Sequence, residues 1–345
     1  MAKRNKLTER QKRQVGKNLR KKLSQKSQDI SDDKLGAEQH GRVVGRFGQH
    51  ADVRDDAGVV RRCHIRRTVD SVVCGDHVQF RALEVEEETI KGVIEAVIPR
   101  TSELSRPDFY DGIKPIAANI DQIIVVSSLL PAFSSNIIDR YLVAAEDVGI
   151  TPVIVLNKID LMTEDNKAEI HEALSNYQKI GYSVLQVSGK TQVGVQQLET
   201  LVKDKVSVFV GQSGVGKSSL INALMPEANE LVGDVSETSG LGQHTTTSAK
   251  LLRFAKGGEL IDSPGVREFA LWHLPEEKIA NYFIEFRDYL GGCKFRDCKH
   301  LDDPGCLLRE AVENGAIAKS RFQNYHSIVQ TMEEQRPSFS TLKRK

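Results

Sequence analysis

The sequence predicts a multidomain chain with a small N-terminal β-barrel, a central α/β domain and a C-terminal, mostly helical domain that binds a metal ion. Three observations support this order. Short β-rich stretches separated by turn residues fill residues 36–100, strand-like and helix-like segments alternate from 121 to 265, and three of the five cysteines lie between 293 and 306. A length of 345 residues suits two or three domains.

Composition limits the class of protein. With 39% hydrophobic and 28% charged residues, the chain has the balance of a soluble globular protein. No apolar run approaches the roughly 18 residues of a membrane-spanning helix, and no apolar stretch follows the charged N-terminus as a secretory signal requires. An odd number of cysteines does not suit a disulfide framework. We therefore expect a cytoplasmic, monomeric protein without membrane contact.

Residues 1–35 are predicted to be a basic, disordered arm. Residues 1–26 hold eleven Lys or Arg and one Glu. Because this segment carries ten net positive charges and the whole chain only one, the remaining residues carry a net charge of −9. Such a block is typical of an arm attracted to a polyanion. Binding to RNA or DNA phosphates is favoured over a solubility tail or a localisation signal.

Residues 36–102 are predicted to form the barrel. Four or five strands within some 65 residues suit an OB-fold. The aromatic residues Phe47 and Phe80 and an arginine-rich strand would suit nucleic-acid binding. A merely solvated face is the alternative. The candidate RNA-binding residues are Arg61, Arg62, Arg66 and Arg67.

After a polar stretch rich in turn residues (100–115), the pattern changes to that of a parallel sheet covered by helices. This second domain is placed at 103–272, and Thr163 is expected to cap one of its helices. Strands are expected within 121–130, 151–158, 182–190, 207–214, 249–254 and 259–265, and helices within 136–149, 163–180, 193–203 and 216–225.

Residues 211–218 fit the phosphate-binding pattern G-x-x-x-x-G-K-[ST]. In such a loop the glycines let backbone N–H groups converge on phosphate oxygens, and the following helix offers its positive N-terminus. Lys217 would reach the β- and γ-phosphates, and the Ser218 hydroxyl would bind Mg²⁺. The strand before the loop and the helix after it argue against a plain glycine turn.

The NKID segment at 157–160 predicts guanine recognition. Asp160 can accept hydrogen bonds from N1–H and the 2-amino group of guanine, a pair that adenine lacks, so the wrong base leaves a carboxylate unpaired. Asn157 would brace the loop and contact the base, and the Lys158 stem would pack on its face. The VSGK segment supplies a supporting loop through Ser188 and Gly189. On its own, NKID could be a helix-capping turn; beside a phosphate loop, we interpret it as base recognition.

Two further motifs follow the phosphate loop. GLGQHTTT (240–247) offers Thr246 for Mg²⁺ and the γ-phosphate, and DSPG (262–265) offers Asp262 for Mg²⁺ through water and the Gly265 N–H for the γ-phosphate. The residues expected to bind GTP are Asn157, Lys158, Ile159, Asp160, Ser188, Gly189, Gly211, Gln212, Ser213, Gly214, Val215, Gly216, Lys217, Ser218, Ser219, Asp262 and Gly265.

The order of these motifs predicts a circular permutation. A standard GTPase runs from phosphate loop through two switches to the base-reading and supporting loops, whereas this chain has the last two first. The same sheet forms if the two termini of a standard GTPase are joined and its chain is opened at another point. Domains tolerate this change because their termini usually lie close together.

Residues 273–345 are expected to form a metal-stabilised domain with a tail. Cys293, Cys298, His300 and Cys306 give C-x₄-C-x-H-x₅-C, a set of three thiolates and one imidazole that suits one closed, structural Zn²⁺ site. An iron–sulfur site and reduced cysteines in a small core are the alternatives. Two helices, broken near Asn314-Gly315, are expected after the cluster. Cys63 and Cys74 are interpreted as buried apolar residues.

This motif order, flanked by a small barrel and the cysteine cluster, resembles the ribosome small subunit-dependent GTPase A family over nearly the whole chain. The resemblance implies an OB-fold, a permuted GTPase domain and a zinc domain whose four ligand positions match. It also implies GTP hydrolysis that is stimulated by the small ribosomal subunit and its rRNA and that serves late subunit maturation.

Hydrolysis raises a separate question, because Val266 stands where many GTPases have a water-orienting glutamine after the switch glycine. His244, beside the switch threonines, can accept a water proton near neutral pH. The resemblance supports a histidine there but leaves its role open, and packing or capping is the alternative. Lys217, His244 and Thr246 are the residues expected to act in hydrolysis.

Two rival functions remain open at this point. One is an RNA-binding assembly scaffold in which GTP hydrolysis is incidental. The other is a P-loop ATPase or a transport-linked G protein. Asp160 argues against the ATPase, and the lack of an apolar span argues against transport.

Overall fold

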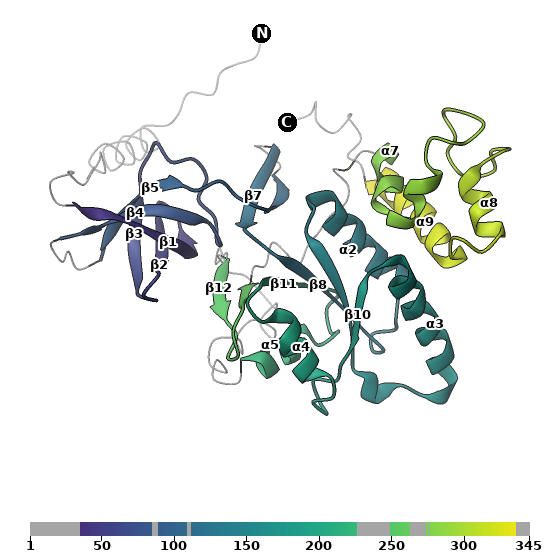
Figure 1. Cartoon of the computed structure of the whole chain (residues 1–345), viewed down its shortest axis with the longest axis horizontal. Helices are drawn as coiled ribbons and strands as arrows, with labels where there is room; N and C mark the ends of the chain where they lie inside the picture. The colour runs from purple at the N-terminus through teal and green to yellow at the C-terminus, as the bar shows by residue number, and fades with distance from the viewer. Residues whose placement is uncertain are drawn as a thin grey trace, which may run out of the picture.

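The computed structural model describes residues 35–84, 89–108, 112–225, 249–262, 274 and 276–335. The predicted arm up to residue 34 and the predicted site residues His244, Thr246 and Gly265 lie outside these ranges. Along the long axis of the molecule, a barrel, an α/β layer structure and a group of helices follow one another (Figure 1). Within the described residues, no helix is long and apolar enough to cross a membrane.

The N-terminal barrel has five strands, in agreement with the predicted four or five. The closing contacts are antiparallel pairings of the first strand with both the second and the fourth, and the third strand runs parallel to the fifth. The strands are β1 (Leu35–Phe47), β2 (His50–Asp55), β3 (Val60–Ile65), β4 (His77–Leu83) and β5 (Gly92–Val97).

The barrel has its own apolar core, which includes Val43, Val53 and Ile94. Phe80 is fully buried in it, so the prediction that this ring helps to bind nucleic acid from the surface is wrong. The alternation of the strand places Phe80 inward with Val78. Cys63 and Cys74 are buried, as predicted, and burial raises the pKa of each thiol to about 12.

The stretch at 100–115 differs from its prediction. It contains a strand pair, β6 (Glu103–Asp108) and β7 (Gly112–Ala118), instead of turns alone. The two strands form a small sheet of their own. Their charged residues and prolines interrupt the alternation of apolar and polar residues that identifies a strand.

The central domain is a parallel sheet in the strand order β10-β9-β8-β11-β13, with β12 antiparallel at its edge. Strands such as Val206–Val210, which is apolar except for Ser207, are buried along their whole length because helices cover the sheet. The elements are β8 (Gln122–Ser128), α2 (Ser135–Val148), β9 (Thr151–Asn157), η2 (Ile159–Leu161), α3 (Glu164–Ile180), β10 (Ser183–Gln186), α4 (Val195–Val202), β11 (Val206–Val210), α5 (Lys217–Leu224), β12 (Lys250–Arg253) and β13 (Glu259–Asp262).

Local signals explain the helix ends. Thr163 is the N-cap of α3, where its backbone N–H donates to Asn166 Oδ1 at 3.0 Å. Gly149 and Gly181 end α2 and α3 in the left-handed conformation, which a glycine adopts without steric cost.

The barrel and the central domain share one eleven-stranded sheet, because β12 pairs with β1 at Lys250 and Gly45. This continuity was not predicted. Beside it, Arg42 and Arg54 of the barrel donate to the Glu259 carboxylate at the start of β13.

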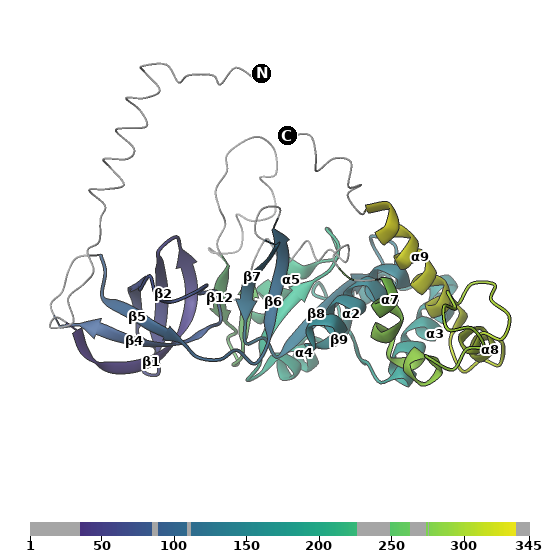
Figure 2. The ribbon, with the colours of Figure 1, turned by 90° about the horizontal axis from the view of Figure 1, so that it is seen from above.

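The C-terminal region is mostly helical, as predicted, and lies against α2 (Figure 2). The predicted break is present, since Asn314 ends a helix and Gly315 has a φ of 80°. The elements are α7 (Glu276–Ile279), η6 (Ala280–Tyr282), η7 (Ile284–Tyr289), α8 (Leu307–Glu313) and α9 (Lys319–Gln335).

Candidate nucleotide site and metal centre

The predicted phosphate loop connects β11 to α5. Three of its glycines have positive φ: 143° at Gly211, 80° at Gly214 and 94° at Gly216. A Cβ on Gly211 would lie 2.2 Å from the Val126 carbonyl oxygen, and one on Gly216 would lie 2.3 Å from Asn157 Nδ2. Only glycine fits the close approach of this loop to its neighbours.

Lys217, the first residue of α5, reaches back over the loop. Its ammonium group donates to the carbonyl oxygens of Gly211 at 2.7 Å and of Gln212 at 2.5 Å. A cation is thereby held above a glycine loop at a helix N-terminus, an arrangement that suits phosphate oxygens.

The NKID segment begins at the end of β9 and lies against the phosphate loop. The buried Asn157 side chain donates to the Val215 carbonyl at 2.9 Å and accepts from the Gly189 N–H at 3.2 Å. One amide thus ties the base-reading, supporting and phosphate loops together. The bracing role expected of Asn157 is present in this geometry.

Lys158 has a φ of 61° and donates from Nζ to the carbonyl oxygens of Leu130 and Gly214, each at 2.6 Å. Asp160 is exposed, and its Oδ1 accepts from the hydroxyl of the buried Ser188 at 2.6 Å. This bond orients the carboxylate while leaving the residue open to solvent.

The segment after β8 also borders the site, although it was not predicted to do so. Leu130 supplies a carbonyl to Lys158, and Pro131 lies where a Cβ on Gly214 would come within 3.6 Å of its ring. No motif marks this segment. Its position follows from topology, because β8 lies between β9 and β11 and all three strands end at the same edge of the sheet.

Asp262 is the last residue of β13, next to β11, so it ends at the same edge as the phosphate loop. The structure therefore brings the described site residues from all these loops to one edge of the sheet. His244, Thr246 and Gly265 fall outside the described residues.

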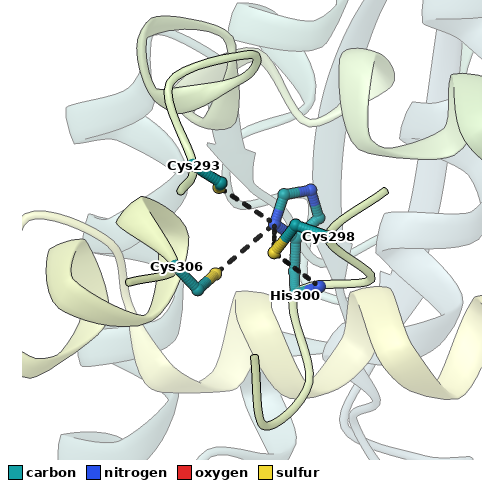
Figure 3. A group of neighbouring side chains, drawn as sticks. All are labelled: Cys293, Cys298, His300 and Cys306. Carbon is teal, nitrogen blue, oxygen red and sulfur yellow. Dashed lines mark hydrogen bonds between the residues drawn. The ribbon is translucent and has the colours of Figure 1, made fainter. Parts of the chain in front are cut away.

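The four predicted metal ligands lie together in the C-terminal region (Figure 3). Their ligand atoms are all within 4.8 Å of one another. His300 Nδ1 lies 3.7 Å from the Cys293 sulfur, 3.5 Å from that of Cys298 and 3.4 Å from that of Cys306.

These residues fit a metal ion by their chemistry. Three sulfurs and one imidazole nitrogen make a closed set of four soft and borderline ligands. Burial lowers the pKa of His300, which favours the neutral imidazole that a metal requires. His326 on α9 lies 3.1 Å from the His300 carbonyl oxygen and so links the cluster to the longest helix of this region.

The predicted RNA-binding arginines are largely engaged with carboxylates. Arg61 pairs with Asp55, Arg62 donates twice to Asp52 at 2.8 and 3.1 Å, and Arg66 donates to Glu95 at 2.9 Å. Arg67 is exposed in the turn after β3.

Around these pairs, Phe47 is 41% exposed and the Arg62 guanidinium lies 5.0 Å from the centre of its ring. Three of the four arginines are therefore held in place by acidic neighbours.

Comparisons with known proteins agree with this geometry. The family model described as RsgA GTPase matches residues 97–272. A small ribosomal subunit biogenesis GTPase RsgA from Shewanella oneidensis is 59% identical over 343 residues, 97% of each chain. A protein of the same description from Vibrio vulnificus is 56% identical over 97% of this chain and 96% of its own.

Two solved structures are similar. YjeQ from Thermotoga maritima has a TM-score of 0.71 at 35% identity and covers 87% of this chain and 100% of its own. YloQ, described as a circularly permuted GTPase, has a TM-score of 0.69 at 28% identity and covers 88% and 98%. The nucleotide motifs occur in reversed order, the described site residues lie at one edge of the sheet, and the similarity to RsgA proteins extends over nearly the whole chain. The chain therefore belongs to the RsgA family of circularly permuted GTPases.

Proposed function

We propose that this GTPase binds the small ribosomal subunit and assists its late maturation, with turnover stimulated by the subunit. The observation that carries the proposal is the 59% identity, over 97% of both chains, to a relative described as a small ribosomal subunit biogenesis GTPase. The convergence of three nucleotide loops on Asn157 supports GTP as the substrate.

In the proposed nucleotide site, residues 211–219 bind the phosphates, and Lys217 moves from its carbonyl partners to the β- and γ-oxygens. Asp160 accepts from guanine, with Ser188 holding its orientation. Ser218 and Thr246 would hold Mg²⁺, with Asp262 as a further oxygen donor nearby, and the ion would neutralise charge on the phosphates. This assignment uses the loop positions at the sheet edge, where open α/β sheets bind ligands.

The metal in the C-terminal cluster is proposed to be one structural Zn²⁺. The ligand set of Cys293, Cys298, His300 and Cys306 supports zinc because thiolates and imidazole suit it and no ligand position is left for water. The ion would hold the connecting loop in place without taking part in hydrolysis.

The proposed RNA contacts come from the basic arm and from the barrel. Charge supports the arm, since residues 1–26 carry eleven basic residues and one acidic residue. If Arg61, Arg62 and Arg66 bind RNA, phosphate groups must replace their acidic partners. Otherwise the contacts with RNA must come from Phe47 and Arg67. Because we propose action on the ribosome, we also propose that the protein works in the cytoplasm, as a monomer.

The deciding experiment measures GTP turnover with and without purified small subunits across a salt series. We expect strong stimulation that falls as salt rises, because phosphate contacts release counterions. Tight subunit binding with unchanged turnover would instead favour a scaffold in which hydrolysis is incidental.

His244→Ala should keep nucleotide and subunit affinity but lose most stimulated turnover, if His244 orients the attacking water. His171→Ala, on the exposed face of α3, is the matched control and should behave like the parent. Full stimulation of the His244 variant would exclude that role.

A further inference from the structure

The four predicted metal ligands of the C-terminal region are spaced like the corners of a metal site. His300 turns its ring nitrogen Nδ1 toward the three cysteine sulfurs, which lie 3.4–3.7 Å from it (Figure 3). In a tetrahedral site with ordinary zinc–sulfur and zinc–nitrogen bond lengths, a sulfur and a nitrogen ligand are about 3.6 Å apart. The cluster therefore has the dimensions of a zinc site, and this fit depends on the orientation of His300.

His300 reaches this orientation through an uncommon backbone conformation. Its φ is 60°, in the left-handed region that a residue other than glycine adopts at a cost in free energy. The His300 N–H donates to the Cys298 sulfur at 3.4 Å. The His300 carbonyl oxygen lies 3.1 Å from Nε2 of His326. Both polar groups of the His300 backbone are thus engaged, and these contacts hold the costly conformation in place.

The contact with His326 can have only one direction. Because a carbonyl oxygen accepts hydrogen bonds and cannot donate them, Nε2 of His326 must carry the proton and donate it to His300. His326 lies on α9, 26 residues further along the chain. By contrast, the Lys294 N–H donates to the Gly305 carbonyl at 3.1 Å within the ligand-bearing loop itself. The histidine pair therefore ties this loop to a helix outside it.

The imidazole of His326 is held by aromatic neighbours. Its ring centre lies 4.6 Å from that of Phe322 and 4.8 Å from that of Tyr325, both in edge-to-face geometry. Tyr325 is buried and packs edge-to-face on Phe283 and Phe286. Because these rings belong to the apolar core of the C-terminal region, packing sets the position of the donor nitrogen.

Helix α9 is fixed in turn against the central domain by a buried polar network centred on Asp139 of α2. The Asp139 carboxylate accepts from Arg321 Nη1 at 2.5 Å, from Asn324 Nδ2 at 2.6 Å and from the Tyr177 hydroxyl at 2.6 Å. Arg321 also donates twice to Glu285, at 2.6 and 3.0 Å. Since a buried, hydrogen-bonded ion pair is costly to break, the helix that carries the donor is a firm support.

We propose that His326 is a positioning residue of the metal centre: from α9 it holds the backbone of His300 in the left-handed conformation that turns Nδ1 toward the three sulfurs. The inference rests on the proposed Zn²⁺ site at the four ligands. Without this hydrogen bond, the His300 backbone relaxes toward conformations of lower free energy. The four ligands remain, but the costly conformation must be restored whenever the ion binds, so the affinity for zinc falls.

The test is a competition for Zn²⁺ between the full-length protein and a chromophoric chelator, with two variants that separate the hydrogen bond from the packing. His326→Phe keeps an aromatic ring but has no donor, so the Kd for zinc should rise about tenfold, as on loss of an outer-shell partner of a metal ligand. His326→Gln loses the ring but can place an amide N–H near the same carbonyl oxygen, so its Kd should stay within about threefold of that of the parent.

Equal zinc affinities of His326→Phe and the parent would overturn the proposal. It would also be overturned if His326→Gln bound zinc more weakly than His326→Phe, because the ring and not the donor would then matter. Gln323→Ala, exposed on the same helix, is the matched control and should leave the Kd unchanged. The same titration counts the zinc ions bound per parent chain. A parent that binds none would show that the proposed zinc site is wrong, and the role of His326 with it.

Discussion

The central domain is attached to its two neighbours in different ways. On one side, the barrel keeps a largely separate apolar core. It is joined to the central domain by the β1–β12 register pair, by the Glu259 ion cluster, and by Cys74 and Val44, which pack in the core of the central sheet. On the other side, the C-terminal region shares its apolar core with α2 and encloses the Asp139–Arg321 network.

The contacts on the barrel side are also less buried than those on the C-terminal side. Between the barrel and the sheet lies a cleft of about 720 Å³ lined by Arg42 and His77 from the barrel and by Lys205 and Arg253 from the central domain. The side chains of Arg42, Arg54 and Glu259 are 11–17% exposed, whereas those of Asp139 and Arg321 are 0 and 3% exposed. The C-terminal region is therefore part of the body of the GTPase. The barrel keeps most of its core to itself and is held by an ion cluster, one strand edge and the packing of Cys74 and Val44.

Metal removal should give the largest effect and tests the C-terminal side. Structural zinc sites contribute on the order of 10 kcal/mol of binding free energy to folding. Chelation should therefore release amide-exchange protection across 276–335 and, through the shared core, in α2, while protection in the barrel strands stays. Unchanged protection across 276–335 after chelation would show that the cluster does not hold this region together.

Arg321→Leu should cost about 3–5 kcal/mol of unfolding free energy, because it leaves the buried carboxylate of Asp139 and the partly buried carboxylate of Glu285 without their cation. Denaturant unfolding measures the loss. Arg309→Leu on α8 is the control: its contacts to Asp302 and Glu313 are long, at 3.8 and 3.9 Å, so its cost should stay below about 1 kcal/mol. Equal losses of unfolding free energy in the two variants would show that the buried network contributes no more to stability than an exposed ion pair.

Glu259→Gln should cost about 2 kcal/mol, since Arg42 and Arg54 lose the charge of their shared acceptor. Because this cluster is partly open to solvent, raising the salt concentration should reduce the difference between parent and variant. Glu38→Gln, exposed on the same barrel, should cost much less. A loss of unfolding free energy as large as that of Arg321→Leu would show that the barrel is attached as firmly as the C-terminal region.

Arg287→Ala should have the smallest effect, about 0.5 kcal/mol, because its side chain is 50% exposed in its pair with Glu146. The measurement is again the unfolding midpoint in denaturant. A loss above about 2 kcal/mol would mean that the rim of this interface, and not its buried centre, holds α2 to the C-terminal region.

The two sides also differ in how well they could be predicted. The barrel strands follow from alternation and turn residues, yet its attachment to β12 leaves no local signal at Gly45 or Lys250. Helix α9 follows from its apolar spacing, yet nothing in that spacing identifies Arg321 as the partner of a residue on α2.

By itself, the sequence determined the order of the domains, the permuted arrangement of the nucleotide motifs and the composition of the cysteine cluster, because each depends on residues within a few positions of one another. The tertiary structure alone decided the long-range pairings. Asp139 and Arg321 are 182 residues apart, and Arg42 and Glu259 are 217 apart. It also decided that Arg61, Arg62 and Arg66 meet carboxylates and that Tyr141 lines a small cavity with Gln212 and Val215 of the phosphate loop. Charge and periodicity show that a side chain needs a partner, but the partner is selected only when folding closes the chain between them.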